Sequence, residues 1–237
     1  MRLAVITGGS RGLGRALCEQ YLMCGYEVIE FSRTAPHVFS VRLDLAFPER
    51  SQAVVAKAVG SVDLASLQEL VVINNAGTLT PIGVSSHKPA EALLGNLNTN
   101  FTSAILVLSV LVATFQSVRC IKRVVNISSG AALKGYAGWS LYCASKAGME
   151  SYIRALAVEQ QTELHPFTAI NIDPGVIDTD MQALIRAASV ADFPELERFI
   201  QRKRQGGLAK PSDVAAAILR ILASPSLSGG GRYEVNT

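Results

Sequence analysis

Short apolar runs alternate with segments of helical periodicity along the chain, and this alternation restricts the fold more than any other feature of the sequence. Strands separated by helices form parallel sheets, because each helical crossover returns the chain to the same end of the sheet. We therefore expect an α/β fold with a doubly wound parallel β-sheet and helices on both faces. Ligands of such sheets bind beyond the carboxyl ends of the strands. The expected strands lie at residues 3–7, 27–31, 38–43, 69–74, 121–127, 167–172 and 232–235.

The composition predicts one domain. With 237 residues, of which 49% are hydrophobic and 17% charged, the chain can bury one large core but is short for two. We expect a single domain at residues 1–237, without internal repeats or linkers. Residues 178–209 lack a strand pattern, and we expect them to form a mobile helical flap on the substrate side.

Charge and cysteine spacing indicate which partners to expect. The net charge is +3, and the basic residues are scattered except for RKR at 202–204, so we expect no nucleic-acid partner. The longest apolar stretch, residues 101–115, is shorter than the ~20 residues of a membrane span, so we expect a buried helix and no membrane partner. The four cysteines have neither Cys-x-x-Cys nor metal-ligand spacing. Free thiols, no metal site and a cytoplasmic location are therefore expected.

The first apolar run is followed by the glycine-rich stretch TGGSRGLG at residues 7–14, which opens a helical pattern. Gly8, Gly12 and Gly14 permit a tight turn and a close approach of the backbone to a ligand. The N–H groups at the start of the helix can bind a pyrophosphate. A glycine triplet alone is weak evidence, but here it lies between a strand and a helix, as dinucleotide binding requires. The alternative is a purely structural turn.

Five motifs occur in an order that is typical of one family. They are TGGSRGLG at 7–14, NNAG at 74–77, NISS at 126–129, YCASK at 142–146 and PGVIDT at 174–179. In these motifs the chain resembles the classical short-chain dehydrogenases/reductases. The resemblance implies a Rossmann-like sheet, a nicotinamide cofactor, and redox chemistry between a carbonyl and an alcohol. The resemblance also implies a homodimer or homotetramer, with the apolar helix 101–115 and the helix after Tyr142 at the interface.

The resemblance implies a set of cofactor contacts as well. These belong to the glycine loop, to the ends of the second, third and fourth strands, and to the start of the flap. The set is Gly8, Ser10, Arg11, Gly12, Leu13, Gly14, Ser32, Arg33, Asp44, Leu45, Asn75, Ala76, Gly77, Tyr142, Lys146, Ile177 and Thr179.

The end of the second strand bears on which nicotinamide is bound. An acidic residue there accepts a hydrogen bond from the ribose 2′-hydroxyl of NAD, whereas arginine accommodates the 2′-phosphate of NADP. This chain has Ser32 followed by Arg33, and Arg11 adds a second guanidinium suited to a phosphate. Glu30 shares a strand face with Ser32 but lies one pleat deeper, so we expect it to miss the ribose. We expect NADP(H); the alternative is two surface arginines.

Tyr142 and Lys146 are the candidate catalytic pair. On a helix, residues four apart lie on one face, with Cβ atoms about 5–6 Å apart. The ammonium should favour the phenolate and lower the pKa of Tyr142, which makes this tyrosine a candidate general acid. Ser129 precedes Tyr142 by thirteen residues, the spacing of the family. The resemblance implies that Ser129, in preference to Ser128, donates to the carbonyl oxygen, and that Lys146 also binds the nicotinamide ribose.

Asn100 resembles the fourth catalytic member of the family, which holds a water beside the lysine. Asn96 and Asn98 are alternatives, and we favour Asn100 because the apolar helix begins directly after it. The alternative is that all three are structural asparagines that cap a helix or form a turn.

The substrate should be a small carbonyl compound. Residues 174–190 and the end of the chain resemble the sepiapterin reductase and benzil reductase branch of the family, which reduces vicinal dicarbonyls or related α-hydroxy ketones. Trp139 and Met181 are candidate apolar substrate contacts. Glu234 is a candidate partner for a pterin, although Arg232 on the same strand face could neutralise it. We therefore favour a diketone over a pterin.

Two other classes of function are alternatives to a reductase. A catalytically silent NADP(H)-binding regulator would be expected to lack the serine, tyrosine and lysine set. A methyltransferase that uses S-adenosylmethionine would explain the glycine loop but neither YCASK nor NNAG.

Overall fold

Seven strands form one parallel sheet in the order β3-β2-β1-β4-β5-β6-β7, so the expected doubly wound α/β fold is confirmed. The computed structural model describes residues 1–235. Strand order reverses between β1 and β4, which is where such sheets bind ligands. The strands are β1 (Arg2–Thr7), β2 (Glu27–Ser32), β3 (Ser40–Arg42), β4 (Glu69–Asn74), β5 (Ile121–Ile127), β6 (Thr168–Asp173) and β7 (Arg232–Glu234).

Only the third strand is clearly shorter than its apolar run. The expected range was 38–43, whereas β3 begins at Ser40. His37 and Ser40 close a turn, in which the Ser40 N–H donates to the His37 carbonyl at 3.0 Å. The side chain of Val38 points into solvent from this turn.

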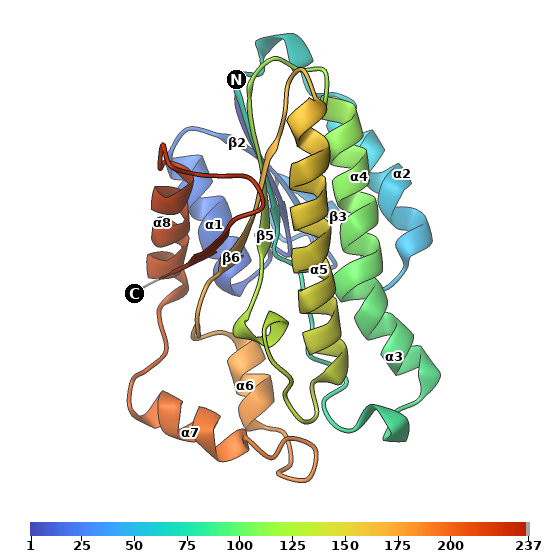
Figure 1. Cartoon of the computed structure of the whole chain (residues 1–237), viewed down its shortest axis with the longest axis vertical. Helices are drawn as coiled ribbons and strands as arrows, with labels where there is room; N and C mark the ends of the chain where they lie inside the picture. Colours follow the sequence, from blue (N-terminus) through green and yellow to red (C-terminus); the bar gives the residue numbers. More distant parts are fainter. Residues whose placement is uncertain (236–237) are drawn as a thin grey trace.

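Helices cover both faces of the sheet (Figure 1). On one face α1 (Gly12–Met23) and α8 (Pro211–Leu222) pack over the central strands. On the other face lie α2 (Pro48–Val59), α4 (Ser103–Phe115) and α5 (Ser140–Glu159). The remaining helices are α3 (Ala90–Leu97), α6 (Asp180–Arg186), α7 (Leu196–Arg204), the π-helix η3 (Asn98–Thr102) and the short 3-10 turns η1 (Leu64–Ser66), η2 (Ser85–His87), η4 (Gly130–Ala132) and η5 (Gln160–Thr162).

Helix α4 packs as a core helix. The continuous helical stretch Ala90–Phe115 is long and apolar enough to cross a bilayer, a criterion that core helices also meet. Leu108, Leu111 and Phe115 are almost fully buried against the sheet. Its outward side chains, including Ile105 and Val110, stay partly exposed.

Residues 178–209 form the two helices α6 and α7 at the carboxyl ends of the strands (Figure 1). We call this segment the flap. Two ion pairs connect the flap to the rest of the protein, Asp180 with Arg11 and Asp192 with Lys88. A third, Asp178 with Lys203, lies within the flap. The flap is therefore closed over the site in this structure.

A row of polar side chains crosses the sheet beneath the site, a feature that the sequence patterns did not indicate. Asn74, Asn126 and Asn171 occupy paired positions on β4, β5 and β6. Asn74 Nδ2 donates to Asn126 Oδ1, and Asn126 Nδ2 donates to Asn171 Oδ1, both at 2.9 Å. Arg232 continues the row on β7.

Candidate active site

The glycine loop has a backbone that fits a dinucleotide phosphate. Gly12 has a φ of 56°, in the left-handed region that favours glycine. A Cβ on Gly14 would lie 2.1 Å from the carbonyl oxygen of Gly8, so a side chain would push the helix away from the loop. Within residues 1–235 no side chain caps the start of α1. The first N–H groups of this helix are thus available to a pyrophosphate.

Buried polar side chains hold the loop from below. Glu30 is 0% exposed; its Oε1 accepts from the Gly9 N–H at 2.8 Å, and its Oε2 accepts from the Ser32 hydroxyl at 3.1 Å. Asn75 Nδ2 donates to the Gly8 carbonyl at 3.1 Å. Glu30 therefore points at the loop rather than outward to a ribose, and the loop is shaped before any cofactor binds.

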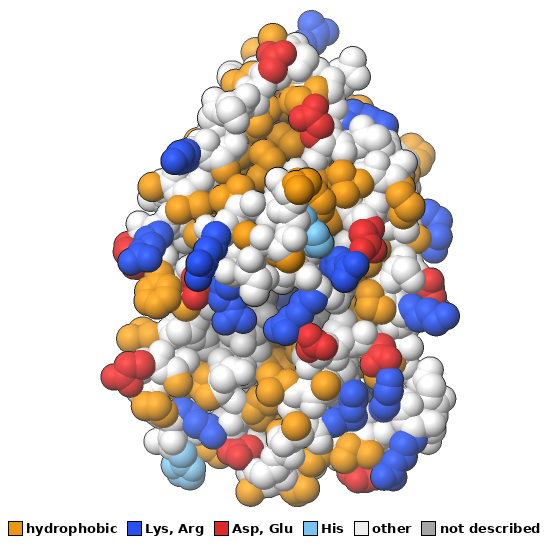
Figure 2. All heavy atoms as spheres, turned by 180° about the vertical axis from the view of Figure 1, so that it is seen from behind, with side chains coloured by type: hydrophobic (Ala, Val, Ile, Leu, Met, Phe, Trp, Pro, Cys, Tyr) orange, Lys and Arg blue, Asp and Glu red, His pale blue; other side chains and the backbone are white. Residues whose placement is uncertain are grey.

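Two arginines lie where a ribose 2′-phosphate is expected. Arg33 is exposed at the end of β2, and within the described chain it makes no hydrogen bond or ion pair. Arg11 Nη1 lies 3.0 Å from Asp180 Oδ2, and both side chains are largely exposed. Ser32 donates its hydroxyl proton to Glu30, and its oxygen accepts from the Ala35 N–H at 3.1 Å. On the face opposite to that of Figure 1, basic side chains gather around a hollow at mid-height (Figure 2).

The other loop and strand-end residues divide into two groups. Leu13 and Leu45 are each 6% exposed because their side chains belong to the cores, so only their backbones can reach a cofactor. Ser10 and Asp44 are half-buried, and Asp44 Oδ1 accepts from the Ala46 N–H at 3.0 Å.

Residues after β4 and before α6 close around the glycine loop. A Cβ built on Gly8 would lie 2.8 Å from Ala76 Cα, so the two backbones touch. Gly77 follows on the same strand end. A Cβ built on Gly12 would lie 3.2 Å from Thr179 Cγ2, so the start of the flap lies against the loop. Ile177 is buried and bridges to Ala209 at the base of the flap.

Ser129, Tyr142 and Lys146 come together at the carboxyl end of β5. Ser129 follows the strand, and its Oγ accepts from the Ala131 N–H at 3.2 Å. The Ser129 hydroxyl lies near enough to the Tyr142 hydroxyl to lower the pKa of the phenol. Lys146 Nζ donates to the Ile127 carbonyl at 2.6 Å and lies 5.6 Å from the centroid of the Tyr142 ring. Ser128 instead turns away to donate to Glu150, as strand alternation predicts.

Burial sets the pKa of both titrating groups. It raises the pKa of Tyr142 to about 12, with the nearby Ser129 hydroxyl acting to lower it and Asp173 acting to raise it. It lowers the pKa of Lys146 to about 8, while Asp173 and Glu150 act to raise it. The lowering of the Tyr142 pKa that the sequence predicted is thus not found, because desolvation of the phenolate is the largest effect on this group.

Asn100 lies in the π-helical turn η3, between α3 and α4. Its Oδ1 accepts from the Thr78 N–H at 2.7 Å, and its Nδ2 donates to the Thr78 carbonyl at 2.8 Å. Asn96 Oδ1 also accepts from Asn100 Nδ2, whereas Asn98 points away to the carbonyl of Ala46. π-Turns are frequent at functional sites. The structure therefore separates the three asparagines by their partners, and only Asn96 and Asn100 face the loop after β4.

An aromatic cluster covers Tyr142 on the flap side. Trp139 stacks on Phe193 of the flap, with ring centroids 4.5 Å apart, and meets Tyr142 edge-on at 6.0 Å. Phe199 adds a third ring at 5.4 Å from Trp139. Met181 packs partly buried against this cluster. Tyr142 is only 8% exposed, and the flap residue Phe193 is packed in the same cluster.

The end of the chain brings charged residues that the motifs did not reveal. Arg232 forms ion pairs with Glu150 and with Asp173, and lies 3.8 Å from Glu234. The Glu234 side chain is 64% exposed on β7. The one available signal was the placement of Glu150 four residues after Lys146, which puts both on one helix face.

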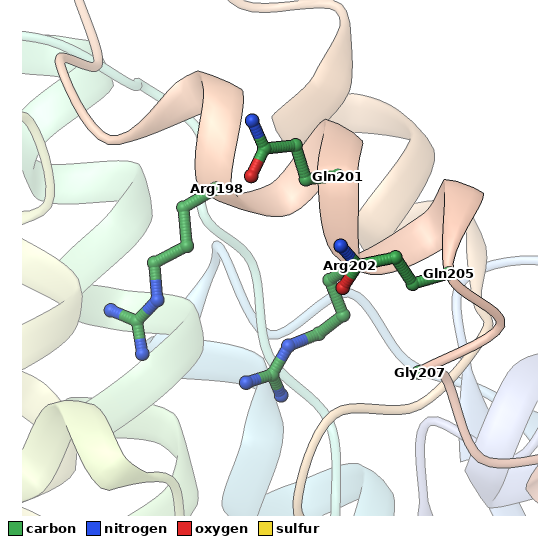
Figure 3. A pocket seen from close by; sticks show the side chains of 5 residues that line it. All are labelled: Arg198, Gln201, Arg202, Gln205 and Gly207. Carbon is green, nitrogen blue, oxygen red and sulfur yellow. The ribbon is translucent and has the colours of Figure 1, made fainter.

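A separate groove runs along the exterior of α7. It is lined by Arg198, Gln201, Arg202, Gln205 and Gly207, and the two arginines project in the same direction (Figure 3). None of the candidate catalytic residues lines it, so it is distinct from the site. Within the described residues, no group of His, Cys, Asp or Glu side chains is arranged to hold a metal ion.

Comparison with known proteins decides the family. A profile described as short chain dehydrogenase matches residues 2–189. The chain belongs to this family. Benzil reductase ((S)-benzoin forming) of Bacillus subtilis (strain 168) is 37% identical to this short-chain dehydrogenase over 234 residues, covering 97% of this chain and 96% of that protein. Sepiapterin reductase of Xenopus tropicalis is 32% identical over 257 residues, covering 98% and 95%.

A solved structure agrees with this assignment. The crystal structure of the KRED1-Pglu enzyme matches with a TM-score of 0.83 and 26% identity, over 98% of this chain and 100% of that one. The fold and family that the five motifs implied are therefore confirmed. The protein is an oxidoreductase of the short-chain dehydrogenase family, and its relatives include both kinds of reductase that the end of the chain resembles.

Proposed function

We propose that this short-chain dehydrogenase is an NADP(H)-dependent carbonyl reductase that converts one carbonyl of a vicinal diketone, or of a related small molecule, to an alcohol. The observation that carries this proposal is the meeting of Ser129, Tyr142 and Lys146 at the carboxyl end of β5, with Lys146 Nζ 5.6 Å from the centroid of the tyrosine ring. A reduction needs a proton donor where negative charge develops on the carbonyl oxygen. The hydroxyls of Ser129 and Tyr142 are the donors at the carboxyl end of β5.

The residues of this chain have distinct roles in the proposed reaction. Ser129 Oγ accepts from the Ala131 N–H, so its own proton stays free to bond the substrate oxygen. Tyr142 transfers its proton to that oxygen, and Lys146 stabilises the phenolate that is left. Asn100 supports the water that returns a proton. When bound, the nicotinamide supplies the hydride to the carbonyl carbon.

The cofactor is NADP(H). Arg33 and Arg11 place two guanidinium groups near the end of β2 and the glycine loop. Glu30, the acidic residue nearest to a ribose 2′-hydroxyl, is committed to the Gly9 N–H beneath the loop. A 2′-phosphate is therefore matched by positive charge, and no carboxylate of β2 faces it.

The substrate side favours a hydrophobic diketone. Trp139, Phe193 and Phe199 line the approach to Tyr142, and the curated relatives named above are a benzil reductase and a sepiapterin reductase. Glu234, the candidate pterin ligand, is mostly exposed beside Arg232. Aromatic walls, with the candidate pterin ligand Glu234 turned to solvent, suit benzil better than a pterin. The alternative substrate is sepiapterin.

The test is NADPH oxidation with benzil, smaller diketones, quinones and sepiapterin. Turnover of benzil at a higher kcat/KM than sepiapterin supports the proposal. Preferred turnover of sepiapterin would transfer the assignment to the pterin enzyme. Tight NADPH binding without turnover of any carbonyl would identify a regulator instead. Glu234→Gln, assayed with both substrates, tests the contact with a pterin. The substitution should raise the KM for sepiapterin selectively only if Glu234 binds the pterin.

We further propose that the chain works as one domain, as a cytoplasmic homodimer or homotetramer. All of its described strands belong to one sheet, and the four cysteines are free thiols. The partly exposed apolar side chains of α4 support a subunit contact there. Light scattering after size exclusion measures the oligomeric state, and a monomer at micromolar concentration would contradict this part of the proposal.

A further inference from the structure

Three charged side chains meet beside the proposed catalytic lysine, and we call them the Arg232 cluster. Arg232 Nη1 is paired with Glu150 Oε1, and Arg232 Nη2 lies 2.7 Å from Asp173 Oδ2. The Ser128 hydroxyl also donates to Glu150. Glu150 is only 3% exposed, and the side chains of Arg232 and Asp173 are 19% and 15% exposed. Removing three charges from water is costly, so stability alone does not explain the arrangement.

The two carboxylates approach Lys146 from different elements. Glu150 lies four residues after Lys146 on α5, so the two side chains share a helix face. Asp173 ends β6, one residue beyond Ile172, which pairs with Ile127 on β5. The carbonyl of Ile127 in turn accepts the hydrogen bond from Lys146 Nζ. The ammonium, itself 7% exposed, is thus held between a helix and a strand that each contribute a carboxylate.

We propose that Glu150 and Asp173, fixed in place by Arg232, are positioning residues that keep the buried side chain of Lys146 protonated. Arg232 orients both carboxylates through one guanidinium and moderates their negative charge. The consequence for catalysis rests on the role of Lys146 in the proposed function. The protonation state itself is a property of the protein without cofactor.

The electrostatics of the surroundings agree with this geometry. Burial pulls the pKa of Lys146 down to about 8, and Asp173 and Glu150 are the two groups that raise it. Without them the pKa of Lys146 would be lower still. Asp173 also raises the pKa of Tyr142, so one carboxylate helps to keep the proton on both groups. Two more charged groups lie at the edge of the cluster: Arg154 contacts the other oxygen of Glu150 at 3.7 Å from an exposed position, and Glu234 lies 3.8 Å from Arg232.

The experiment titrates Lys146 directly. Protein labelled with ¹³C at the lysine Cε is followed by NMR from pH 6 to 11 without cofactor, and the Lys146 signal is assigned by its absence in Lys146→Met. Glu150→Gln is expected to lower the Lys146 pKa, because it removes one of the two negative charges that raise it. Asp173→Asn is expected to act in the same direction, and it serves if Glu150→Gln does not fold.

Two further variants separate this role from a merely structural one. Arg232→Gln removes the positive charge that moderates the two carboxylates, so it is expected to raise the Lys146 pKa. A merely structural role predicts lower stability in every variant, without a Lys146 pKa that falls in Glu150→Gln and rises in Arg232→Gln. Glu159→Gln removes an exposed carboxylate from the end of the same helix and should leave the Lys146 pKa unchanged. Equal pKa values in Glu150→Gln, Asp173→Asn and Glu159→Gln would overturn the proposal.

The kinetic consequence is measured in parallel. The alkaline limb of kcat/KM for NADPH, which reports the free enzyme, should move toward acid pH in Glu150→Gln and Asp173→Asn. Failure of the wild-type protein to reduce any ketone would contradict only the proposed function, because the NMR titration needs no substrate. An unshifted Lys146 titration would contradict only the inference made here, whatever the activity.

Discussion

At the scale of single residues, desolvation decides the chemistry of the site. Tyr142 is 8% exposed, and its raised pKa keeps it protonated throughout the neutral range. That state suits a proton donor in the reducing direction. Lys146 faces the opposite effect, because burial disfavours its charged form. The pKa values of the two groups are therefore set by burial and by neighbouring charges, and not by the spacing of the pair along the helix.

Removal of the phenolic hydroxyl tests the proton donor. Tyr142→Phe keeps the ring against Trp139 but cannot protonate the carbonyl oxygen. We expect kcat for ketone reduction to fall by at least ~10²-fold, the lower end of what general acid catalysis contributes. Fluorescence titration should give an NADPH Kd close to that of the wild type. A kcat within a factor of a few of the wild type would reject Tyr142 as the acid.

Lys146→Met tests the cost of burying the ammonium. The pKa of Lys146 is lower in the folded protein than in the unfolded chain, so the unfolded state binds more protons. The wild type is therefore destabilised below pH 8, and this penalty disappears as the pH rises from about 8 toward 10.5. We expect the variant to be more stable than the wild type at pH 7, with the gain shrinking at pH 10. Urea unfolding at both pH values measures it; a pH-independent difference would contradict the assignment.

Arg33→Asp tests the choice of cofactor. A carboxylate at this position repels a 2′-phosphate and can accept from a 2′-hydroxyl. We expect the ratio of kcat/KM for NADPH to that for NADH to fall by roughly tenfold or more, since each 1.4 kcal/mol changes it tenfold. Arg42→Asp, at the exposed end of β3, is a control for general charge effects. An unchanged ratio in Arg33→Asp would exclude this arginine from phosphate binding.

At the scale of elements, the site depends on two short segments, the π-turn η3 and the flap. The π-turn η3 sets Asn100 against the loop after β4, and the flap places Phe193 over Trp139. Both are local arrangements of a few residues. The flap is held by exposed or half-exposed ion pairs and by the aromatic contacts of Phe193 and Phe199 with Trp139. Exposed ion pairs contribute little, so the aromatic contacts should dominate its closure.

Phe193→Ala tests that dominance. Phe193 is 0% exposed, and truncation of a buried phenylalanine typically costs 3–5 kcal/mol. Because the loss is local to the flap, we expect faster proteolysis within 187–195 and a higher KM for the ketone, with little change in the Kd of NADPH. Phe47→Ala, at a residue 51% exposed, should leave all three unchanged. Unaltered cleavage in Phe193→Ala would show that the ion pairs hold the flap.

At the scale of the whole molecule, the row of asparagines joins the central strands below the site. Asn126 is fully buried between Asn74 and Asn171, and each amide satisfies the next. The row ends at Arg232 and thereby connects the sheet to the Arg232 cluster. Inside a protein such a network is favourable only while every member is paired.

Asn126→Ala tests the network. It leaves the side-chain NH₂ group of Asn74 and the side-chain oxygen of Asn171 without these partners. Each unpaired buried group costs roughly 1–3 kcal/mol. We expect the free energy of unfolding in urea to fall by that amount per group, with an unchanged m-value. A loss below about 0.5 kcal/mol, the size of an ordinary surface substitution, would show that water replaces the missing amide.

The sequence by itself determined the architecture and the catalytic candidates. Alternating apolar runs predicted every strand, because a parallel sheet buries both faces and leaves that pattern in the chain. The motif order indicated the family, and the spacing of Ser129, Tyr142 and Lys146 placed them at one strand end. Such features are local or fixed by topology, so they can be read without coordinates.

Only the tertiary structure decided the properties that depend on distant neighbours. Glu30 turns beneath the glycine loop, and Arg232 reaches Glu150 across 82 positions of the chain. The raised pKa of Tyr142 follows from burial under the flap, which no spacing along α5 reveals. Side-chain direction and desolvation are set by packing between elements far apart in sequence, and for that reason the charges around Lys146 became visible only in the folded chain.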